Sequence, residues 1–273
     1  MEKISDVEEL KRIAKEVRKD IIEEIYNAKS GHPGGALSIA DILTVLYFNQ
    51  MNIDTSNPQK EDRDRLVLSK GHASAAIYAI LAERGFFNKE ELSKFRKLGS
   101  MLQGHPDMKK VPGIDMSSGS LGQGLSIACG MALGSKLKKQ NNRVYTIVGD
   151  GEIEEGQIWE SAMTASHYKL DNLCLIVDYN NLQIDGKITD VMNSNPIDKK
   201  FESFGFEVFN IDGNEIEELI NTFEKAKGIK EKPVAIVART VKGKGVSFME
   251  NKQEWHGKAP SEEEYNTAMK ELQ

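Results

Sequence analysis

The sequence predicts an α/β fold: a single doubly wound, mainly parallel β-sheet of about five strands flanked by helices. Short segments rich in apolar residues alternate with helical segments through the second half of the chain. Strands that are apolar throughout are buried on both faces, and their alternation with helices indicates crossover connections in a parallel sheet. There is no repeat, low-complexity tract or linker, so we expect one domain over residues 1–273. The expected strands are 65–69, 144–148, 173–178, 207–209 and 234–238.

The helices of the first half are predicted from residue spacing and from capping residues. Apolar residues three and four apart predict an extended N-terminal helix over 5–27, and Ser5 with Glu8 has capping-box spacing. A loop rich in glycine and proline follows around His32. The next helices are expected at 38–49, 73–84 and 88–98, the last one capped by Asn88 and Glu91.

Residues 99–124 separate the two halves of the chain. They are rich in glycine and lack periodicity, which predicts a long loop, and long loops in compact domains usually carry function. Beyond the loop, helices are expected at 125–138, 158–168 and 214–227, the last one capped, with a short helix before residue 207. Ser261 and Glu264 have capping-box spacing and predict a C-terminal helix over 261–272.

Composition and charge exclude several classes of protein. The 273 residues carry a net charge of −6, which argues against nucleic acid as a general partner because such binding needs a basic face. No apolar run approaches the roughly 20 residues of a membrane span, and the charged, helical N-terminus is unlike a signal peptide. Cys129 and Cys174 lie in apolar surroundings without metal-ligand spacing, which indicates buried, reduced thiols. We therefore expect a soluble, cytoplasmic protein.

Asp150 stands between two glycines directly after the expected strand 144–148. Glycine and aspartate are common turn residues, so a tight turn alone would explain this stretch. Open parallel sheets, however, bind ligands beyond the carboxyl ends of their strands. If one crossover helix joins adjacent strands, Asp150 shares this edge with the polar end of the next strand: Asp178, Asn180, Asn181 and Leu182.

Oxygen atoms at this edge suit a small, hard cation. Asp150, Asn180 and the carbonyl of Leu182 offer the oxygens that Mg²⁺ and Ca²⁺ prefer, and such ions often take further oxygens from a bound phosphate. The N–H of Gly151 would face the same anion. Two acids follow nearby and would repel a diphosphate, so they should point away into a partner. Alternatively, they are a helix N-terminal acid and a solvated helix residue: Glu155 and Glu160.

The histidines give a second signal. Three of the five follow a glycine, and a fourth also lies in a loop: His32, His72, His105 and His256. Four histidines beside residues that permit close backbone approach predict a convergent polar pocket, whereas His167 lies on an expected helix and should be structural. The sequence has no zinc-type Cys/His cluster, no GxSxG and no P-loop, and "GSLGQG" at 119–124 lacks the preceding strand of a Rossmann motif.

Taken in order, the motifs of this chain resemble those of transketolases. "GDG" at 149–151, followed by "YNN" at 179–181, resembles the thiamine diphosphate-binding motif of enzymes that form C–C bonds. The further motifs are "SGHPGG" at 30–35, "SKGHA" at 69–73, "QGHP" at 103–106, "GSLGQG" at 119–124, "GDGEIEEGQIWE" at 149–160 and "KGKG" with "WHG" between 242 and 257. The set spans nearly the whole chain and implies a thiamine diphosphate-binding (PP) domain over 1–273.

The resemblance also implies a role for each matching residue. Asp150, Asn180 and the Leu182 carbonyl would hold Mg²⁺ or Ca²⁺ against the diphosphate of the cofactor. The implied cofactor-binding residues are His72, Gly119, Leu121, Gly151, Glu155, Asn180, Ile184 and His256. The implied catalytic residues, which would exchange protons with the hydroxyls and carbonyl of a ketose, are His32, His72, His105 and His256. Glu155 and Glu160 would form a carboxylate network between two active sites across a dimer interface.

Two departures from the family pattern matter. Ser120 stands where many relatives have proline. No pyrimidine-binding domain follows within the 273 residues, although in transketolases that domain supplies the glutamate that activates the cofactor. The resemblance therefore implies the N-terminal subunit of a split transketolase, which works with a separate C-terminal, pyrimidine-domain subunit in an α2β2 heterotetramer.

Such an enzyme would transfer a two-carbon ketol unit from a ketose phosphate to an aldose phosphate in pentose phosphate metabolism, for example from xylulose 5-phosphate to ribose 5-phosphate. Two alternatives stay open. One is half of another thiamine-diphosphate transferase, dihydroxyacetone synthase-like or 1-deoxyxylulose-5-phosphate synthase-like. The other is a non-catalytic module that retains this fold.

Overall fold

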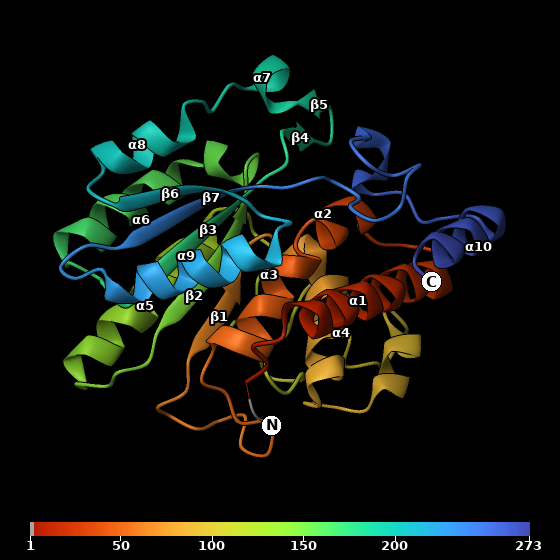
Figure 1. The fold of residues 1–273 in the computed structure, drawn as a ribbon, viewed down its shortest axis with the longest axis horizontal. Coiled ribbons are helices and arrows are strands. Elements are labelled where there is room, and N and C mark those ends of the chain that lie inside the picture. Colours follow the sequence, from red (N-terminus) through yellow and green to blue (C-terminus); the bar gives the residue numbers. More distant parts are fainter. Residues whose placement is uncertain (1–2) are drawn as a thin grey trace.

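A parallel five-stranded sheet runs through the centre of the computed structural model, which describes residues 3–273 (Figure 1). The strands stand in the order β1-β2-β3-β7-β6, and every neighbouring pair is parallel. This confirms the predicted fold class and each of the five predicted strands. Their bounds are β1 (Arg65–Leu68), β2 (Val144–Gly149), β3 (Leu173–Tyr179), β6 (Glu207–Asp212) and β7 (Val234–Arg239).

Helices cover both faces of this sheet (Figure 1). The longer ones are α1 (Val7–Ala28), α4 (Ser74–Arg84), α5 (Gln123–Leu137), α6 (Gly156–His167), α9 (Ile216–Gly228) and α10 (Glu262–Glu271). The shorter ones are α2 (Pro33–Leu37), α3 (Ala40–Val45), α7 (Ile188–Val191) and α8 (Ile197–Ser203). A π-helical turn, η1 (Leu46–Gln50), follows α3, and the 3₁₀ turns are η2 (Gly71–Ala73), η3 (Lys89–Lys94), η4 (Glu152–Glu154) and η5 (Gln253–His256). An unpredicted antiparallel hairpin follows β3: β4 (Leu182–Gln183) and β5 (Gly186–Lys187).

The strands divide their side chains between two hydrophobic cores. Ile147, Ile176 and Ile236 belong to the core shared with α1, α3, α4 and α9. The residues after Ile147 and Ile176, Val148 and Val177, point the other way and pack in the core of α5, α6 and α8. Because successive side chains of a strand face opposite sides, these apolar strands are buried on both faces, as a doubly wound sheet requires.

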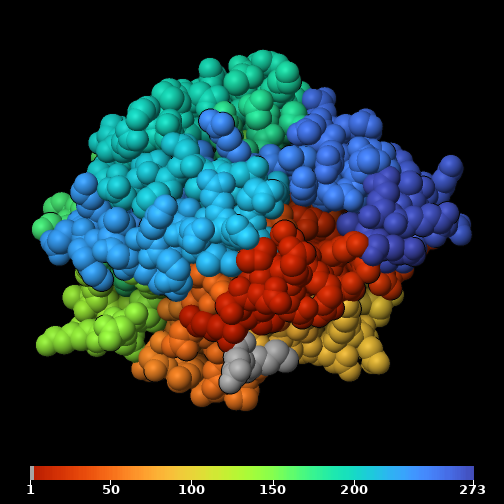
Figure 2. All heavy atoms as spheres, viewed as in Figure 1, coloured from red at the N-terminus to blue at the C-terminus, as the bar shows by residue number. Residues whose placement is uncertain are grey.

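The two ends of the described chain pack together on the surface. Figure 2 shows the C-terminal segment, in dark blue, against the red N-terminal helix. The contact is between α1 and α10, where the rings of Tyr26 and Tyr265 stack with centroids 4.1 Å apart. Within residues 3–273, none of the helices is both long and apolar enough to cross a membrane.

The capping residues were only partly predicted. The capping box of Ser261 and Glu264 is confirmed at the start of α10. The predicted box of Ser5 and Glu8 is wrong, because Asp6 caps α1 and accepts the N–H of Glu8 at 2.9 Å. The capped start of α9 at residue 214 is also wrong, since the Asn214 amide instead donates to Asp41 at 2.8 Å.

Two helix boundaries also differ from prediction, whereas the long loop is confirmed. The helical region expected at 38–49 already begins at Pro33, and the expected helix 88–98 is only the 3₁₀ turn Lys89–Lys94. No helix or strand is formed over 95–122. Cys129 and Cys174 are both buried and free, as expected.

Gly124→Ala is expected to destabilise the protein by about 1–3 kcal/mol, the usual cost of overpacking. Gly124 lies in the first turn of α5, and a Cβ there would come within 2.6 Å of the Ser69 Cα at the end of β1. Gly130→Ala on the same helix is the matched control, because a Cβ there meets no atom within 4 Å. It should stabilise the helix by roughly 0.5–1 kcal/mol. Urea unfolding of both variants measures this, and equal effects would contradict the packing explanation.

Candidate active site

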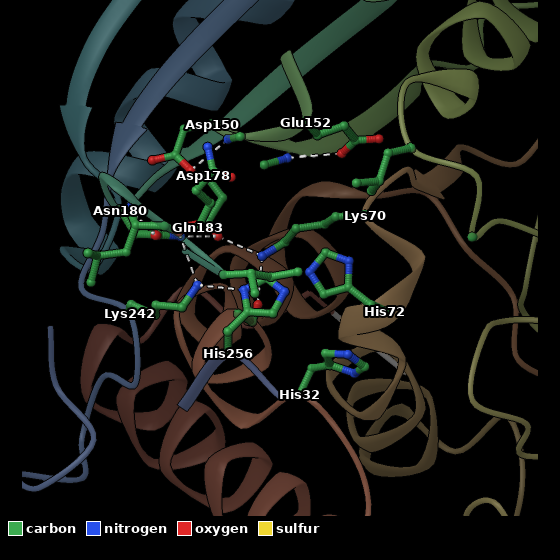
Figure 3. A pocket seen from close by; sticks show the side chains of 17 residues that line it. His32, Lys70, His72, Asp150, Glu152, Asp178, Asn180, Gln183, Lys242 and His256 are labelled. Atoms are coloured by element: carbon green, nitrogen blue, oxygen red, sulfur yellow. Dashed lines mark hydrogen bonds and ion pairs between the residues drawn. The ribbon is translucent and has the colours of Figure 1, made fainter. Parts of the chain in front are cut away.

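A pocket lies at the carboxyl ends of β2 and β3 (Figure 3). The register pairs Gly149 with Asp178, so the polar residues that follow the two strands share one edge of the sheet, as predicted. The cavity has a volume of ≈ 300 Å³. The predicted site residues that line it are His32, His72, Gly119, Leu121, Asp150, Gly151, Asn180, Leu182, Ile184 and His256.

Asp150 is a buried acid, only 2% exposed, at this edge. Its Oδ1 accepts the N–H of Gly151 at 2.9 Å, and its Oδ2 accepts the N–H of Asn181. Burial, and then the negative charge of Asp178, raise the pKa of Asp150 to about 7. A cation bound beside Asp150 would stabilise its charged form, so this acid fits the role of a metal ligand.

Asn180 and Leu182 bring two neutral oxygens to the same edge. The Asn180 amide donates to Asp178 Oδ2 at 3.0 Å, which fixes the orientation of the amide group. Asn180 Oδ1 accepts the N–H of Leu182 at 3.1 Å, and the Leu182 carbonyl accepts Lys242 Nζ at 3.1 Å. Each of these oxygens keeps a second lone pair. Among residues 3–273 no group of three or more His, Cys, Asp or Glu side chains is arranged to hold a metal.

Two buried lysines face these acids, and sequence reasoning missed both roles. Lys70 Nζ lies 2.6 Å from Asp178 Oδ2 and donates to the Gly35 carbonyl at 2.6 Å. Burial, and then the charge of Lys70, lower the pKa of Lys242 to about 8. Both lysines line the cavity. Together they provide buried positive charge at the cavity, which suits an anionic group such as a diphosphate.

Three histidines from distant segments form one cluster in the pocket (Figure 3). The ring centroids lie 5.2 Å apart for His32 and His72, 5.7 Å for His32 and His256, and 5.1 Å for His72 and His256. Burial lowers the pKa of His32 to about 4, of His72 to about 2 and of His256 to about 3. The rings are therefore neutral near pH 7, and each has one donor and one acceptor nitrogen.

The remaining predicted residues lie outside the lining of the cavity. His105 is exposed, but its ring lies beside the pocket residue Gly119, where an added Cβ would be 3.0 Å from His105 Cδ2. Glu155 and Glu160 are exposed, consistent with acids that point away from the cavity. His167 is exposed at the end of α6 and contacts Tyr168 rather than the pocket.

The buried acids Glu152 and Asp178 were not assigned functions from the sequence. Asp178 is fully buried and accepts from Ser38, Thr240, Lys70 and Asn180. Glu152 is 3% exposed and also lines the cavity. Glu152 lies within a recognised motif and Asp178 directly precedes one, but most of their partners come from remote segments, so no local pattern reveals their roles.

The sequence of residues 9–272 matches the family model for the thiamine diphosphate-binding domain of transketolase. The chain belongs to the transketolase family. This family places it among thiamine-diphosphate-dependent transferases, and the predicted family resemblance is confirmed. A transketolase from Campylobacter jejuni has the same fold, with a TM-score of 0.92 and 35% sequence identity. The match covers 98% of this chain and 43% of that protein, so the chain spans less than half of the solved transketolase.

Several relatives of this transketolase-family chain have nearly its own length. The 6-deoxy-6-sulfo-D-fructose transketolase subunit SqwG of Clostridium sp. (strain MSTE9) is 46% identical over 97% of this chain and 96% of its own. An apulose-4-phosphate transketolase subunit of Phocaeicola vulgatus is 41% identical over 97% of this chain and 94% of its own. Human transketolase is 43% identical, but the match covers only 40% of that protein.

Proposed function

We propose that this chain is the N-terminal, diphosphate-binding subunit of a split transketolase. The observation that carries the proposal is one pocket. In it, three oxygens suited to bind a metal ion, from Asp150, Asn180 and Leu182, lie beside two buried lysines and three neutral histidines. Relatives that are named as transketolase subunits and are matched over 94% or more of their length support the assignment of this chain as one subunit of two.

The pocket fits thiamine diphosphate together with a divalent cation. Asp150, Asn180 Oδ1 and the Leu182 carbonyl would hold Mg²⁺ or Ca²⁺, with Lys242 and Lys70 opposite the diphosphate charge. The Gly151 N–H, expected from the sequence to face the anion, donates instead to Asp150 Oδ1. When bound, the cofactor supplies a carbon nucleophile and an electron sink for cleavage of a C–C bond. The remaining contacts proposed on the cofactor are those of Gly119, Leu121 and Ile184, which line the cavity. Glu155, expected from the resemblance to bind the cofactor, lies outside this lining and is proposed below for a subunit interface.

We propose that the histidines bind the sugar substrate through hydrogen bonds. His32, His72 and His256 are neutral, so each has one donor and one acceptor nitrogen. His256 Nδ1 lies 3.2 Å from Lys242 Nζ and would accept from it, which leaves the Nε2 N–H of His256 to donate to a ketose oxygen. His32 Nδ1 is buried without a partner among the described residues, so Nε2 is the ring nitrogen of His32 that we propose meets the substrate. His105, beside Gly119 and exposed, would meet the sugar farther from the cluster.

A second chain would complete the site. We propose that a C-terminal, pyrimidine-domain subunit supplies the activating glutamate, in a cytoplasmic α2β2 heterotetramer. Glu155 and Glu160 are exposed, which leaves them accessible to a carboxylate network across such an interface.

Xylulose 5-phosphate is the proposed ketol donor and ribose 5-phosphate the proposed acceptor, in pentose phosphate metabolism. The names of the relatives provide a second candidate set of ketoses for the same reaction: 6-deoxy-6-sulfo-D-fructose and apulose 4-phosphate. A donor panel with a common aldose acceptor distinguishes them by kcat/KM.

The assembled enzyme is expected to lose kcat/KM for the ketose on the order of hundredfold when His32 is replaced by alanine, because one proton-transfer group is removed. His167→Ala is the matched control, since His167 is exposed away from the pocket, and the kcat/KM of this variant should not change.

Ketol transfer by this chain with thiamine diphosphate and Mg²⁺ also tests the proposed function itself, when it is measured for the chain alone and with a pyrimidine-domain subunit. Full activity of the chain alone would overturn the split-enzyme proposal, and no turnover with any such subunit would favour a non-catalytic module.

A further inference from the structure

Glu152 is a buried carboxylate that joins three separate segments of the pocket wall (Figure 3). Its Oε1 accepts the N–H of Gly122 at 2.9 Å and also the hydroxyl of Ser69. Its Oε2 accepts the N–H of Gly149 at 3.0 Å. Ionised carboxylates make hydrogen bonds about twice as strong as neutral acceptors do. One side chain therefore ties together the end of β1, the glycine loop before α5 and the end of β2.

Each of the three donors adjoins a residue of the pocket. Ser69 precedes Lys70, and Gly149 precedes Asp150. Gly122 follows Leu121, which with Gly119 forms the loop wall of the cavity. Gly122 has a φ of +83°, so the loop turns sharply at the residue that Glu152 holds. A change in the position of Glu152 would thus move the loop wall relative to the turn that carries Asp150.

We propose that Glu152 is a positioning residue for the cofactor, because it fixes the distance between the loop 119–122 and the turn 149–151. The loop carries the proposed cofactor contacts Gly119 and Leu121, and the turn carries the proposed metal ligand Asp150, so the inference rests on the proposed function. Glu152 acts through the two backbone segments that it holds, and its effect should appear in cofactor affinity rather than in the rate at saturating cofactor.

Glu152→Gln tests this with almost no change in shape. Glu152 Oε1 accepts from Gly122 and Oε2 from Gly149, whereas an amide has only one acceptor oxygen. In either orientation of the glutamine, its NH₂ group therefore faces one of these backbone N–H groups, and that hydrogen bond is lost. A lost bond of this kind, with a buried donor left unpaired, should weaken thiamine diphosphate binding on the order of tenfold. The probe is thiamine diphosphate with Mg²⁺, titrated by calorimetry into this chain combined with a pyrimidine-domain subunit. The apparent KM for the cofactor should rise by a similar factor, with kcat at saturation within about threefold.

Asp115→Asn is the matched control. Asp115 is a carboxylate of similar burial, 5% exposed, that also holds a backbone N–H, accepting Leu66 N–H at 2.8 Å near the start of β1 rather than at its pocket end. It pairs with Arg63 and Arg65 and does not line the cavity. Its replacement should lower Tm but leave the affinity for thiamine diphosphate unchanged.

The outcomes separate this inference from the proposed function. Wild-type protein that binds no thiamine diphosphate would overturn the proposed function and this inference with it. Binding by wild type and an equal affinity of Glu152→Gln would overturn the inference alone, as would an equal loss in Asp115→Asn. If Glu152→Gln does not fold, Ser69→Ala removes one donor and leaves the other two bonds. We expect about threefold weaker binding for that variant, and no weakening would overturn the inference.

Discussion

Asp150→Ala is expected to weaken the binding of thiamine diphosphate with Mg²⁺ by at least about hundredfold. Removal of a residue that merely supports a metal ligand already costs roughly 10–100-fold in metal affinity. Asp150 would be the one charged ligand among three proposed oxygen donors, and its loss also leaves the N–H groups of Gly151 and Asn181 without their acceptor. Calorimetric titration of the assembled enzyme with cofactor, in Mg²⁺ and separately in Ca²⁺, measures the effect.

Asp212→Ala provides the control for this variant. Asp212 is also an acid at the carboxyl end of a strand of the same sheet, followed by a glycine, but it ends β6 and is exposed. Its Oδ1 accepts the N–H of Asn214 at 2.8 Å, a turn interaction that Asp150 also makes with its own neighbour. Unchanged cofactor affinity is expected for Asp212→Ala. Normal affinity in Asp150→Ala would show that the metal assignment is wrong.

The position of Asp150 at one edge of the sheet could be predicted from two local patterns in the sequence. Apolar runs marked two strands, and the single helix between them made the strands neighbours. The observed pairing of Gly149 with Asp178 confirms this step, and Asn180 follows directly from it. Convergence of the histidines could also be predicted from their loop settings, and three of the four share the cavity lining.

The buried polar network could not be predicted, because its partners are far apart in the sequence. Lys70 and Asp178 are 108 positions apart, and Ser69 and Glu152 are 83 positions apart. Hydrophobic periodicity reports which side of one segment is buried, and it carries no information about which remote charge a buried lysine meets. In the sequence Lys70 reads as one lysine among 36 basic residues. Only the fold shows that it is 2% exposed.

The start of α2 shows a different limit of sequence reasoning. Glycines and prolines near His32 predicted a loop, but Pro33 is the first residue of a helix, where its fixed φ is favourable. The following Gly34 serves close packing, since an added Cβ would lie 2.9 Å from the Trp255 carbonyl oxygen and 3.0 Å from Lys242 Cγ. A glycine required by tertiary contact looks the same in a sequence as a glycine required by a turn.

Lys70→Met is expected to lower the free energy of unfolding by about 3–5 kcal/mol, the range for breaking a buried ion pair from one side. The Lys70–Asp178 pair has an N–O distance of 2.6 Å, with side chains only 2% and 0% exposed. Burial alone would raise the pKa of Asp178, but Lys70 and hydrogen bonds from Thr240 and Ser38 hold it below its ordinary value. Methionine fills similar volume without the charge, so Asp178 would remain buried without its ammonium partner. Urea unfolding monitored by circular dichroism measures the loss.

Lys169→Met is the control that shows whether the loss of stability comes from breaking any ion pair or only from breaking a buried one. Lys169 and Glu231 form a pair with the same N–O distance, 2.6 Å, but their side chains are 62% and 67% exposed. Exposed pairs contribute about 0–1 kcal/mol, so this variant should be nearly neutral. Equal destabilisation by the two lysine replacements would contradict the assignment of the effect to a buried charge.

A double variant, Lys70→Met with Asp178→Asn, tests the same assignment from the other partner. If the penalty in Lys70→Met comes from an unpaired carboxylate, removal of that charge should recover part of the stability. The two changes would then be non-additive by about 0.5–3 kcal/mol, as found for residues in direct contact. Strict additivity would mean that Lys70 stabilises the protein through its bond to the Gly35 carbonyl and its packing. Asp178 would then hold the Asn180 amide without help from the lysine charge.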